Sequence, residues 1–400
     1  MDHVHTPLDL VLAHAPENPV AIARPHRVEA AAKWFQSHFP GQIFYAVKAN
    51  PSLWALDALW AAGIRGFDVA SEAEVRLVAE RFGSEARLAF MHPVKSRRAI
   101  SRAYHDFGVR TFVLDSAEEL EKIQCETGYA KDLTLIVRLA VSNEGASLPL
   151  AAKFGASGED AEALLRRARY ATEELMGVSF HVGSQCMDPG AYRRAMQEAS
   201  RAIVRAGVVA DVVDVGGGFP AIYPGMQPPA MQRYMDVIAE SFEDMFVAQN
   251  AQLWAEPGRA LVAEAGSVVV RVDLRKGDAL YLNDGAYGNL FDAAHVDWPF
   301  PVKLLRAQDS AAPGQAFRFY GPTCDSIDAA KGPFLLPGDV REGDFLEIGM
   351  LGAYGVAMST RFNGFGDTAT VEAADAPWAS LYTQPAGRLL RLDKARRRGK

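Results

Sequence analysis

Residues 44–51 read Phe-Tyr-Ala-Val-Lys-Ala-Asn-Pro. A short β-forming apolar run leads to a lysine, and an Asn-Pro pair then ends the extended segment. A charge at the end of a buried strand is costly, so Lys48 has two interpretations. In one, its amine reaches solvent along an apolar stem. In the other, partial burial and neighbouring cations lower its pKa, so that the amine can form a Schiff base.

Further strand-like runs follow this one at the spacing typical of βα units. Together they are predicted at 43–48, 66–69, 87–91, 111–114, 133–138, 177–181, 212–215 and 253–256. Amphipathic stretches with helical periodicity, such as 70–82 and 161–172, separate them. This alternation predicts a (β/α)8 TIM barrel. A doubly wound open sheet is the alternative, but it requires a glycine-rich turn early in the chain, and the sequence shows none there.

The predicted strand ends carry polar residues or glycine. These are Lys48, Asp68 with Ser71, His92, Asp115, Arg138, His181, the glycines 216–218 and Glu256. The carboxyl ends of the strands in such a barrel meet at one face, where active sites lie. We therefore expect these residues to share one site.

The pattern changes after about residue 265. Strand-like runs at 268–274, 278–282, 316–320 and 344–348 follow with few helical stretches between them. Residues 1–25 carry several prolines and little periodicity, and we interpret them as a leader that packs on another part of the chain. The predicted domains are a barrel over 26–264 and a mostly β domain formed by 1–25 and 265–400.

Composition narrows the class of protein. The 400 residues are 49% hydrophobic, which is enough for a large core and two domains. The net charge of −7 provides no basic field for nucleic acid. Three scattered cysteines predict neither a disulfide framework nor a metal site, and they favour a reducing compartment. Without a predicted signal peptide or membrane-spanning run, the expected location is cytoplasmic.

Three segments near the predicted strand ends suggest an anion site. Gly-Gly-Gly-Phe-Pro at 216–220 exposes backbone N–H groups where such barrels often bind phosphate, although a plain tight loop is the alternative. Arg259, three residues after Glu256, can add a charge-assisted bond, or it can be a surface arginine at a helix start. His181 can stack on a planar ring and Ser184 can bind phosphate, or His181 can be structural.

Taken together, the segments resemble the fold type III pyridoxal-phosphate decarboxylases. This group of ornithine, lysine, arginine and diaminopimelate decarboxylases shares its barrel with alanine racemase. The matching segments are Tyr-Ala-Val-Lys (45–48), Phe-Asp (67–68), Lys-Phe-Gly (153–155), His-Val-Gly-Ser (181–184), Gly-Gly-Gly-Phe-Pro (216–220), Glu-Pro-Gly-Arg (256–259), Asn-Asp-Gly (283–285), Gly-Pro-Thr-Cys-Asp-Ser (321–326) and Gly-Ala-Tyr (352–354). They occur in the family's order along nearly the whole chain, and they are most similar to ornithine/lysine decarboxylases.

The resemblance implies that pyridoxal 5′-phosphate is the cofactor and that Lys48 binds it covalently. It implies that His181 stacks on the ring, that Asp68 and Arg138 support it, and that Glu256 faces the pyridine nitrogen. The other implied cofactor-binding residues, most of them phosphate ligands, are Ser184, Gly217, Gly218, Gly258, Arg259 and Tyr354.

The resemblance also implies that Cys324 protonates the carbanion after decarboxylation and that Asp325 binds the distal amine of the substrate. In the family both residues reach the pocket of the neighbouring subunit, which implies a homodimer with composite active sites. Glu256 favours decarboxylation over racemisation, because a carboxylate keeps the pyridine nitrogen protonated and the ring a strong electron sink. An arginine at that position, as in alanine racemase, weakens the sink.

The implied substrate is L-ornithine, with L-lysine second, giving putrescine or cadaverine and CO2 in polyamine biosynthesis. Diaminopimelate enzymes usually carry Glu at the position of Asp325, and biosynthetic arginine decarboxylases of this fold are much longer. Ornithine enzymes have a second acidic contact where this chain has Val296, and we expect Asp297 to replace it, with Phe362 also at the substrate. Diaminobutyrate, D-ornithine, D-lysine, carboxynorspermidine and diaminopimelate remain alternative substrates. A racemase or a silent pyridoxal-phosphate-binding homologue is less favoured.

Overall fold

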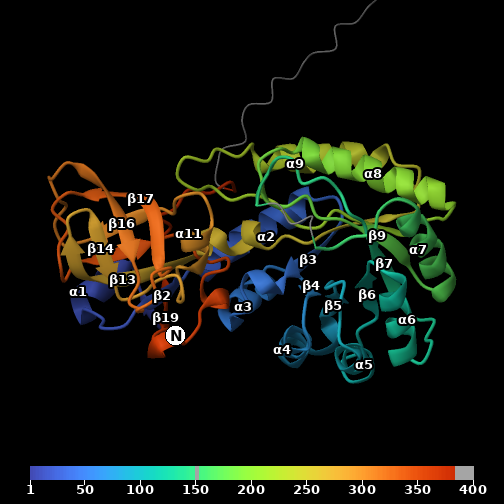
Figure 1. The fold of residues 1–400 in the computed structure, drawn as a ribbon, viewed down its shortest axis with the longest axis horizontal. Helices are drawn as coiled ribbons and strands as arrows, with labels where there is room; N and C mark the ends of the chain where they lie inside the picture. The colour runs from blue at the N-terminus through green and yellow to red at the C-terminus, as the bar shows by residue number, and fades with distance from the viewer. Residues whose placement is uncertain (149–152, 383–400) are drawn as a thin grey trace, which may run out of the picture.

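A parallel barrel forms one lobe of the molecule in the computed structural model, which describes residues 1–148 and 153–382 (Figure 1). Within these residues the barrel closes in the strand order β11-β12-β3-β4-β5-β6-β7-β9. The strands are β3 (Gln42–Ala46), β4 (Gly66–Val69), β5 (Arg87–Phe90), β6 (Thr111–Leu114), β7 (Thr134–Arg138), β9 (Met176–Ser179), β11 (Val212–Asp214) and β12 (Gln252–Ala255). The predicted (β/α)8 barrel is therefore confirmed.

Helices surround the barrel on its outside (Figure 1). They are α2 (Pro25–His38), α3 (Leu53–Ala61), α4 (Glu72–Phe82), α5 (Arg97–His105), α6 (Ala117–Glu126), α7 (Gly158–Ala171), α8 (Gly190–Ala206) and α9 (Met231–Glu243). Three consecutive helices begin at a serine, because the hydroxyl groups of Ser71, Ser96 and Ser116 accept hydrogen bonds from backbone N–H groups of the first turn. Each cap ends a loop that starts at a strand end, so these loops are short and held at both ends.

The first barrel strand ends earlier than predicted. We expected an extended chain up to Lys48, but β3 stops at Ala46 and the segment Val47–Ala49 forms a 3-10 turn, η1. Asn50 closes the turn by donating its backbone N–H to the carbonyl of Val47 (3.1 Å). The turn carries Lys48 inward over the end of the barrel.

A mostly β lobe lies beside the barrel. In the described part of the chain, its nine-stranded sheet contains β1 (Asp2–Val4), β2 (Val20–Ala23), β13 (Gly266–Lys276), β14 (Ala279–Leu282), β15 (Val302–Leu305), β16 (Gly314–Tyr320), β17 (Ala329–Pro337), β18 (Phe345–Ile348) and β19 (Ala369–Ala373). Strand β2 pairs antiparallel with β13 and parallel with β19. The two ends of the described chain therefore meet in one sheet, with α1 (Pro7–His14) between its first two strands. Residues 383–400 of the predicted second domain lie outside the described residues.

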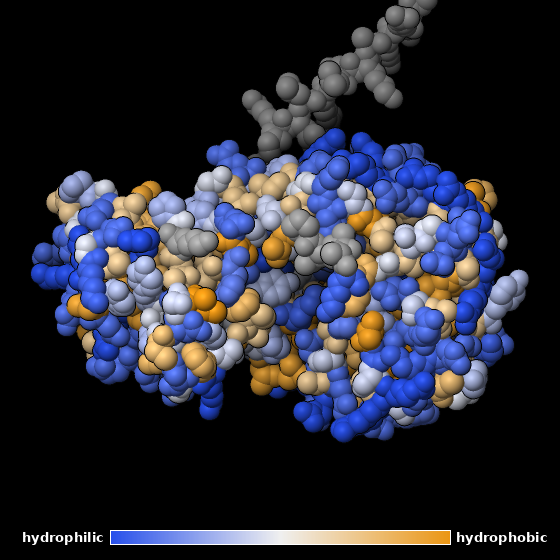
Figure 2. Space-filling model, viewed as in Figure 1, coloured by the Kyte–Doolittle hydropathy of each residue, from blue (hydrophilic) through white to orange (hydrophobic). Residues whose placement is uncertain are grey.

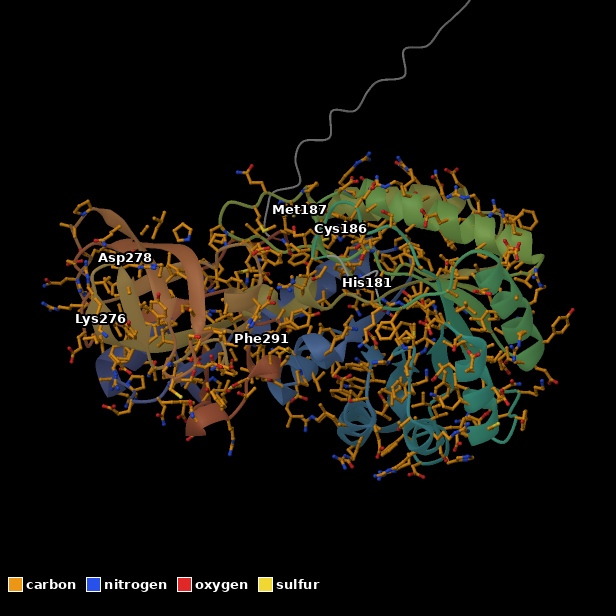
Figure 3. All side chains as sticks on the ribbon, viewed as in Figure 1. His181, Cys186, Met187, Lys276, Asp278 and Phe291 are labelled. Atoms are coloured by element: carbon orange, nitrogen blue, oxygen red, sulfur yellow. The ribbon has the colours of Figure 1, made fainter. Side chains whose placement is uncertain are left out.

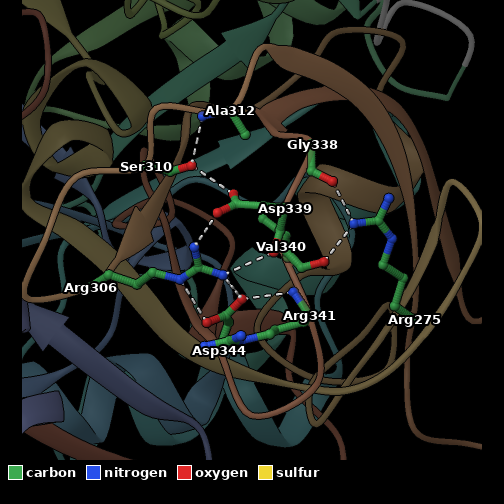
Figure 4. Close-up of polar contacts among 9 residues, drawn as sticks. All are labelled: Arg275, Arg306, Ser310, Ala312, Gly338, Asp339, Val340, Arg341 and Asp344. Carbon is green, nitrogen blue, oxygen red and sulfur yellow. Dashed lines mark hydrogen bonds and ion pairs between the residues drawn. The ribbon is translucent and has the colours of Figure 1, made fainter.

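Charged side chains bind the loops of this β lobe to one another (Figure 4). The guanidinium group of Arg306 donates to both carboxylate oxygens of Asp344 (2.9 and 2.6 Å) and to the carboxylate of Asp339 (2.8 Å). Arg275 donates to the carbonyl oxygens of Gly338 and Val340. These bonds fix the turn between β17 and β18 against the ends of β13 and β15.

A buried ion-pair network connects the start of α2 to the sheet. Arg24 has no exposed surface, and it donates to Glu347, Ser267 and Asp375 at 2.8 Å each. Helix α10 (Arg259–Val262), directly after the last barrel strand, packs on α2 nearby. Several hydrophobic side chains, orange in Figure 2, also lie at the junction of the two lobes. No helix in the described residues is long and apolar enough to cross a bilayer.

Candidate active site

A cavity of about 260 Å³ lies at the carboxyl ends of the barrel strands. The sequence-predicted residues that line it are Lys48, Arg138, His181, Ser184, Gly217, Gly218, Glu256, Gly258, Arg259 and Tyr354. They come from the ends of five barrel strands or the segments that follow them, except Tyr354, which the β lobe contributes. Asp68 lies beneath them, buried against Lys48. The structure therefore brings together the residues that the sequence distributes over three hundred positions.

Lys48 is ion-paired in this cavity. Its Nζ donates to the carboxylate of Asp68 at 2.6 Å, and Asp68 is 1% exposed. Burial by itself lowers the pKa of the Lys48 amine, but the carboxylates of Asp68 and then Glu256 raise it, and the net shift is upward. We expected neighbouring cations to lower this pKa. That expectation is wrong for the free amine, because its nearest charged neighbours are carboxylates.

Glu256 and Asp214 form a buried pair of carboxyl groups. Burial first, and then the charge of Asp214, raises the pKa of Glu256, while burial raises the pKa of Asp214 to about 6. Asp214 accepts the backbone N–H of Gly216 at 2.8 Å, whereas Oε1 of Glu256 has no hydrogen-bond partner in the described residues. Asp214 was missed from sequence because it lies inside the run 212–215. The signal was a carboxylate two residues before the glycine loop.

His181 stands beside this pair as a neutral ring. Burial lowers its pKa to about 3, and the positive charges of Arg138 and Lys48 add to the shift. Its Nδ1 accepts the backbone N–H of Gly183 at 3.0 Å, which fixes the orientation of the ring. Figure 3 shows His181 on the side of the barrel lobe nearer the β lobe, with Cys186 and Met187 above it in this view.

The glycine loop requires glycine because its backbone packs too closely on neighbouring carbonyl oxygens to admit a Cβ. A Cβ at Gly218, where φ is +101°, would lie 2.4 Å from the carbonyl oxygen of Gly183. At Gly217 it would lie 2.7 Å from the carbonyl oxygen of Glu256. Backbone N–H groups and small residues therefore form this wall, as an oxyanion requires.

Arg259 is not a free cation at this wall. Its Nη1 donates to Asp292 and to the hydroxyl of Tyr223, both at 2.7 Å, and its Nε contacts Ser184 at 3.4 Å. Neither Asp292 nor Tyr223 was assigned to the site from sequence. The pairing with Asp292 joins residues far apart in the chain, so local sequence carried no signal for it.

Besides Asp68, four other predicted residues do not line this cavity. Cys324 is exposed on the β lobe, and Asp325 accepts the hydroxyl of Tyr287 at 2.6 Å. Phe362 packs on the ring of Tyr287, with 4.7 Å between ring centres. Asp297 lines a separate groove, with Trp298, Pro224 and Pro333.

Asp328, which sequence analysis did not single out, organises the turn that carries Cys324. Its carboxylate accepts the backbone N–H groups of Thr323 (3.0 Å) and Ala286 (2.6 Å). A Cβ at Gly285 or Gly321 would lie 2.1 Å from this carboxylate. The two glycines are therefore required for the turn to close around Asp328.

Comparison with known sequences places the chain among the pyridoxal-dependent decarboxylases by two separate matches. Residues 25–263 match the model of the family described as pyridoxal-dependent decarboxylase, pyridoxal binding domain. The lysine/ornithine decarboxylase of Selenomonas ruminantium is 31% identical over 382 residues, which cover 93% of this chain and 94% of the relative.

Solved structures agree with the sequence match. The arginine decarboxylase of Paramecium bursaria Chlorella virus, bound to agmatine, aligns with a TM-score of 0.82 and 28% identity over 91% of this chain and 98% of that chain. The lysine/ornithine decarboxylase of Vibrio vulnificus, complexed with cadaverine, aligns with a TM-score of 0.78 and 29% identity, over 93% of this chain and 100% of that one. The viral arginine decarboxylase is thus close in length to this chain, so length does not disfavour arginine as the substrate, contrary to the expectation from sequence.

Proposed function

Because the chain belongs to the pyridoxal-dependent decarboxylases, we propose that it removes the α-carboxyl group of a basic amino acid, L-ornithine first and L-lysine second. The products are CO2 and a diamine, putrescine or cadaverine, for polyamine biosynthesis. One observation carries this proposal: a single cavity holds the amine of Lys48, the buried carboxyl of Glu256 and the glycine loop at 217–218. The names of the relatives support the class of substrate.

The residues of the cavity fit pyridoxal phosphate. The unpartnered Oε1 of Glu256 is an acceptor for the protonated pyridine nitrogen. Gly217 and Gly218 line the cavity without side chains, which leaves their backbone N–H groups open to a phosphate, and Ser184 and Arg259 line the same cavity as further ligands. Lys48 and Lys153 both line the cavity, and the amine of Lys48, at the end of the first barrel strand, is the group proposed to join the aldehyde.

Each residue has a separate task in the proposed reaction. When bound, the cofactor supplies an electron sink for the electron pair that CO2 leaves behind. Glu256 keeps the proton on the pyridine nitrogen, and the neutral ring of His181 packs against the cofactor without adding a charge. Asp68 orients the amine of Lys48 through the bond at 2.6 Å.

We propose that the site is completed by a second copy of the chain in a homodimer. Cys324 protonates the substrate carbon, Asp325 binds the distal amine, and Phe362 packs against the substrate. Support comes from the exposed surface around them, where hydrophobic side chains gather on the same part of the β lobe. These are Ile327 (61% exposed), Val356 (44%), Phe362 (42%) and Phe365 (42%). Such a patch is typical of a protein interface.

For the second acidic contact we propose Asp292 in place of Asp297. Asp297 is exposed in the separate groove, whereas the buried carboxylate of Asp292 lies against Arg259, which lines the cavity. An ammonium group of the substrate would compete with Arg259 for this carboxylate.

We also propose a cytoplasmic location, because Cys125, Cys186 and Cys324 are all unpaired, which fits a reducing compartment.

A substrate panel tests the proposed function. Purified protein loaded with pyridoxal phosphate is assayed for CO2 release from L-ornithine, L-lysine, L-arginine, D-ornithine, diaminobutyrate and diaminopimelate. Borohydride reduction and peptide mapping should find the cofactor on Lys48, and Lys48→Ala should abolish both signals, while Lys33→Ala on the exposed face of α2 preserves them. Cofactor on Lys48 without CO2 from any substrate would indicate a silent homologue, and racemised substrate without CO2 would indicate a racemase.

A further inference from the structure

The cavity has a second wall that the proposed function leaves without a role. It consists of Met91, His92 and Pro93 from the loop after β5, together with Phe154, and we call it the β5 wall. In the closed strand order, β5 stands four places from β11 in either direction, so the β5 wall lies opposite the glycine loop that follows β11. A ligand that contacts the glycine loop at one end therefore presents its other side to the β5 wall.

His92 is the polar group of this wall, and its tautomer is determined by the backbone. Its Nδ1 accepts the N–H of Val94 at 3.1 Å, so the ring proton of the neutral form resides on Nε2. Nε2 has no hydrogen-bond partner in the described residues. The edge of the ring packs on Phe154, with 5.3 Å between ring centres and 73° between planes. His92 thus presents one N–H donor at the cavity.

The surrounding charges keep this donor neutral. The cations of Lys153 and Arg138 lie 4.9 and 5.7 Å from the ring centre of Phe154, on which His92 packs. Burial lowers the pKa of His92, and the charges of Lys95, Lys153 and Arg138 lower it further, with Glu119 opposing them. A neutral N–H donor among cations suits an oxygen that carries partial negative charge.

A buried lysine holds the loop of His92 in place. The side chain of Lys95 is fully buried, and its Nζ contacts the carbonyl oxygens of His92 (2.9 Å) and Val113 (2.6 Å) and the carboxylate of Glu119 (2.9 Å). These contacts join the loop after β5 to the end of β6 and to α6. The backbone of His92 is therefore fixed by neighbours on two sides.

We propose that His92 is a cofactor-contacting residue whose Nε2–H donates a hydrogen bond to the ring hydroxyl oxygen of pyridoxal phosphate. This inference rests on the proposed function, since it takes the phosphate to lie at the glycine loop. The phosphate arm and the hydroxyl group occupy opposite sides of the pyridine ring. With the phosphate at the glycine loop, the hydroxyl side faces the β5 wall. A donor there stabilises negative charge on that oxygen, next to the carbon that Lys48 binds.

The test measures the cofactor in the absence of substrate. His92→Phe keeps an aromatic ring on Phe154 but removes the donor, and His92→Gln restores an N–H at similar reach. The control is His105→Phe on α5, where the ring contacts the carbonyl of Glu126 on the outer surface. We expect His92→Phe to shift the visible absorption band of the bound cofactor and to raise its dissociation constant about tenfold. His92→Gln should recover most of both properties, and His105→Phe should change neither.

Two results would overturn the inference. One is a His92→Phe holoenzyme with the absorption band and cofactor affinity of the wild type. The other is a variant in which only KM for the amino acid rises, because His92 would then contact substrate instead of cofactor. A wild-type protein that fails to take the cofactor on Lys48 would refute the proposed function itself, so the two failures are distinct.

Discussion

Mixing two inactive variants tests whether one chain supplies Lys48 and its partner supplies Cys324. Lys48 lines the cavity in the barrel, whereas Cys324 is exposed on the β lobe and does not line that cavity. If the two residues act together only across a dimer interface, a heterodimer of Lys48→Ala and Cys324→Ala has one site with both residues intact. Its other site lacks both.

The expected recovery follows from this arrangement. Equal amounts of the two variants, after complete subunit exchange, give about one half heterodimers, each with one of two sites restored, so about 25% of wild-type activity returns. If both residues came from the same chain, every site in the mixture would lack one of them and nothing would return. A composite site therefore predicts about 25% of wild-type activity in the mixture, whereas a site within one chain predicts no activity.

The assay is CO2 release from L-ornithine before and after mixing. Different affinity tags on the two variants measure exchange by co-purification. Cys125→Ala is the matched control, because Cys125 is also exposed but lies on α6 of the barrel, and this variant should be active without a partner. Heterodimers that form in the expected proportion and remain inactive would refute the composite site.

Three further predictions concern stability and cofactor binding. Arg24→Met should lower the free energy of unfolding by about 3–5 kcal/mol in urea denaturation, because it leaves Glu347 charged and buried. The control Lys33→Met breaks an exposed pair with Glu29 and should change the free energy of unfolding by at most about 0.5 kcal/mol. Equal effects of the two substitutions would contradict this prediction. Between pH 6.5 and about 3 the unfolded chain binds a proton on His181 that the folded chain does not, so the folded state loses stability as the pH falls through this window, by about 3–5 kcal/mol. His181→Asn should flatten this acid limb in denaturation curves measured across the window, and an unchanged slope would show that the pKa is not lowered. Gly218→Ala should weaken pyridoxal phosphate binding at least tenfold in an absorbance titration, whereas Gly207→Ala, at a helix end with open space around it, should bind as the wild type does; equal affinities would rule out a steric role for Gly218.

The barrel could be predicted from sequence because its strands are short apolar runs with clear stop signals. β4 and β6 match the predicted ranges, and the other barrel strands differ from them by one or two residues at an end. In the β lobe, β1, β2, β15, β17 and β19 were not predicted as strands. β17 contains Gly332-Pro333, a pair that normally indicates a turn, yet the strand resumes its pairing with β16 beyond it after a shift in register.

In the candidate site, too, some residues could be placed from sequence and others could not. Residues at strand ends, such as Lys48 and Glu256, could be placed at one face because barrel topology brings strand ends together. Contacts between distant segments could not be placed. The pairing of Arg259 with Asp292 and the upward pKa shift of Lys48 both depend on which side chains the fold sets beside each other.

The pairing of β2 with β13 and β19 gives the molecule an order of assembly. Arg24 and Asp375, which bond to each other, are 351 positions apart, so the first strand leaves the ribosome long before its neighbours exist. The barrel, by contrast, is complete once residue 255 has emerged. During synthesis β2 therefore stays without its strand partners until the rest of the β lobe has been translated.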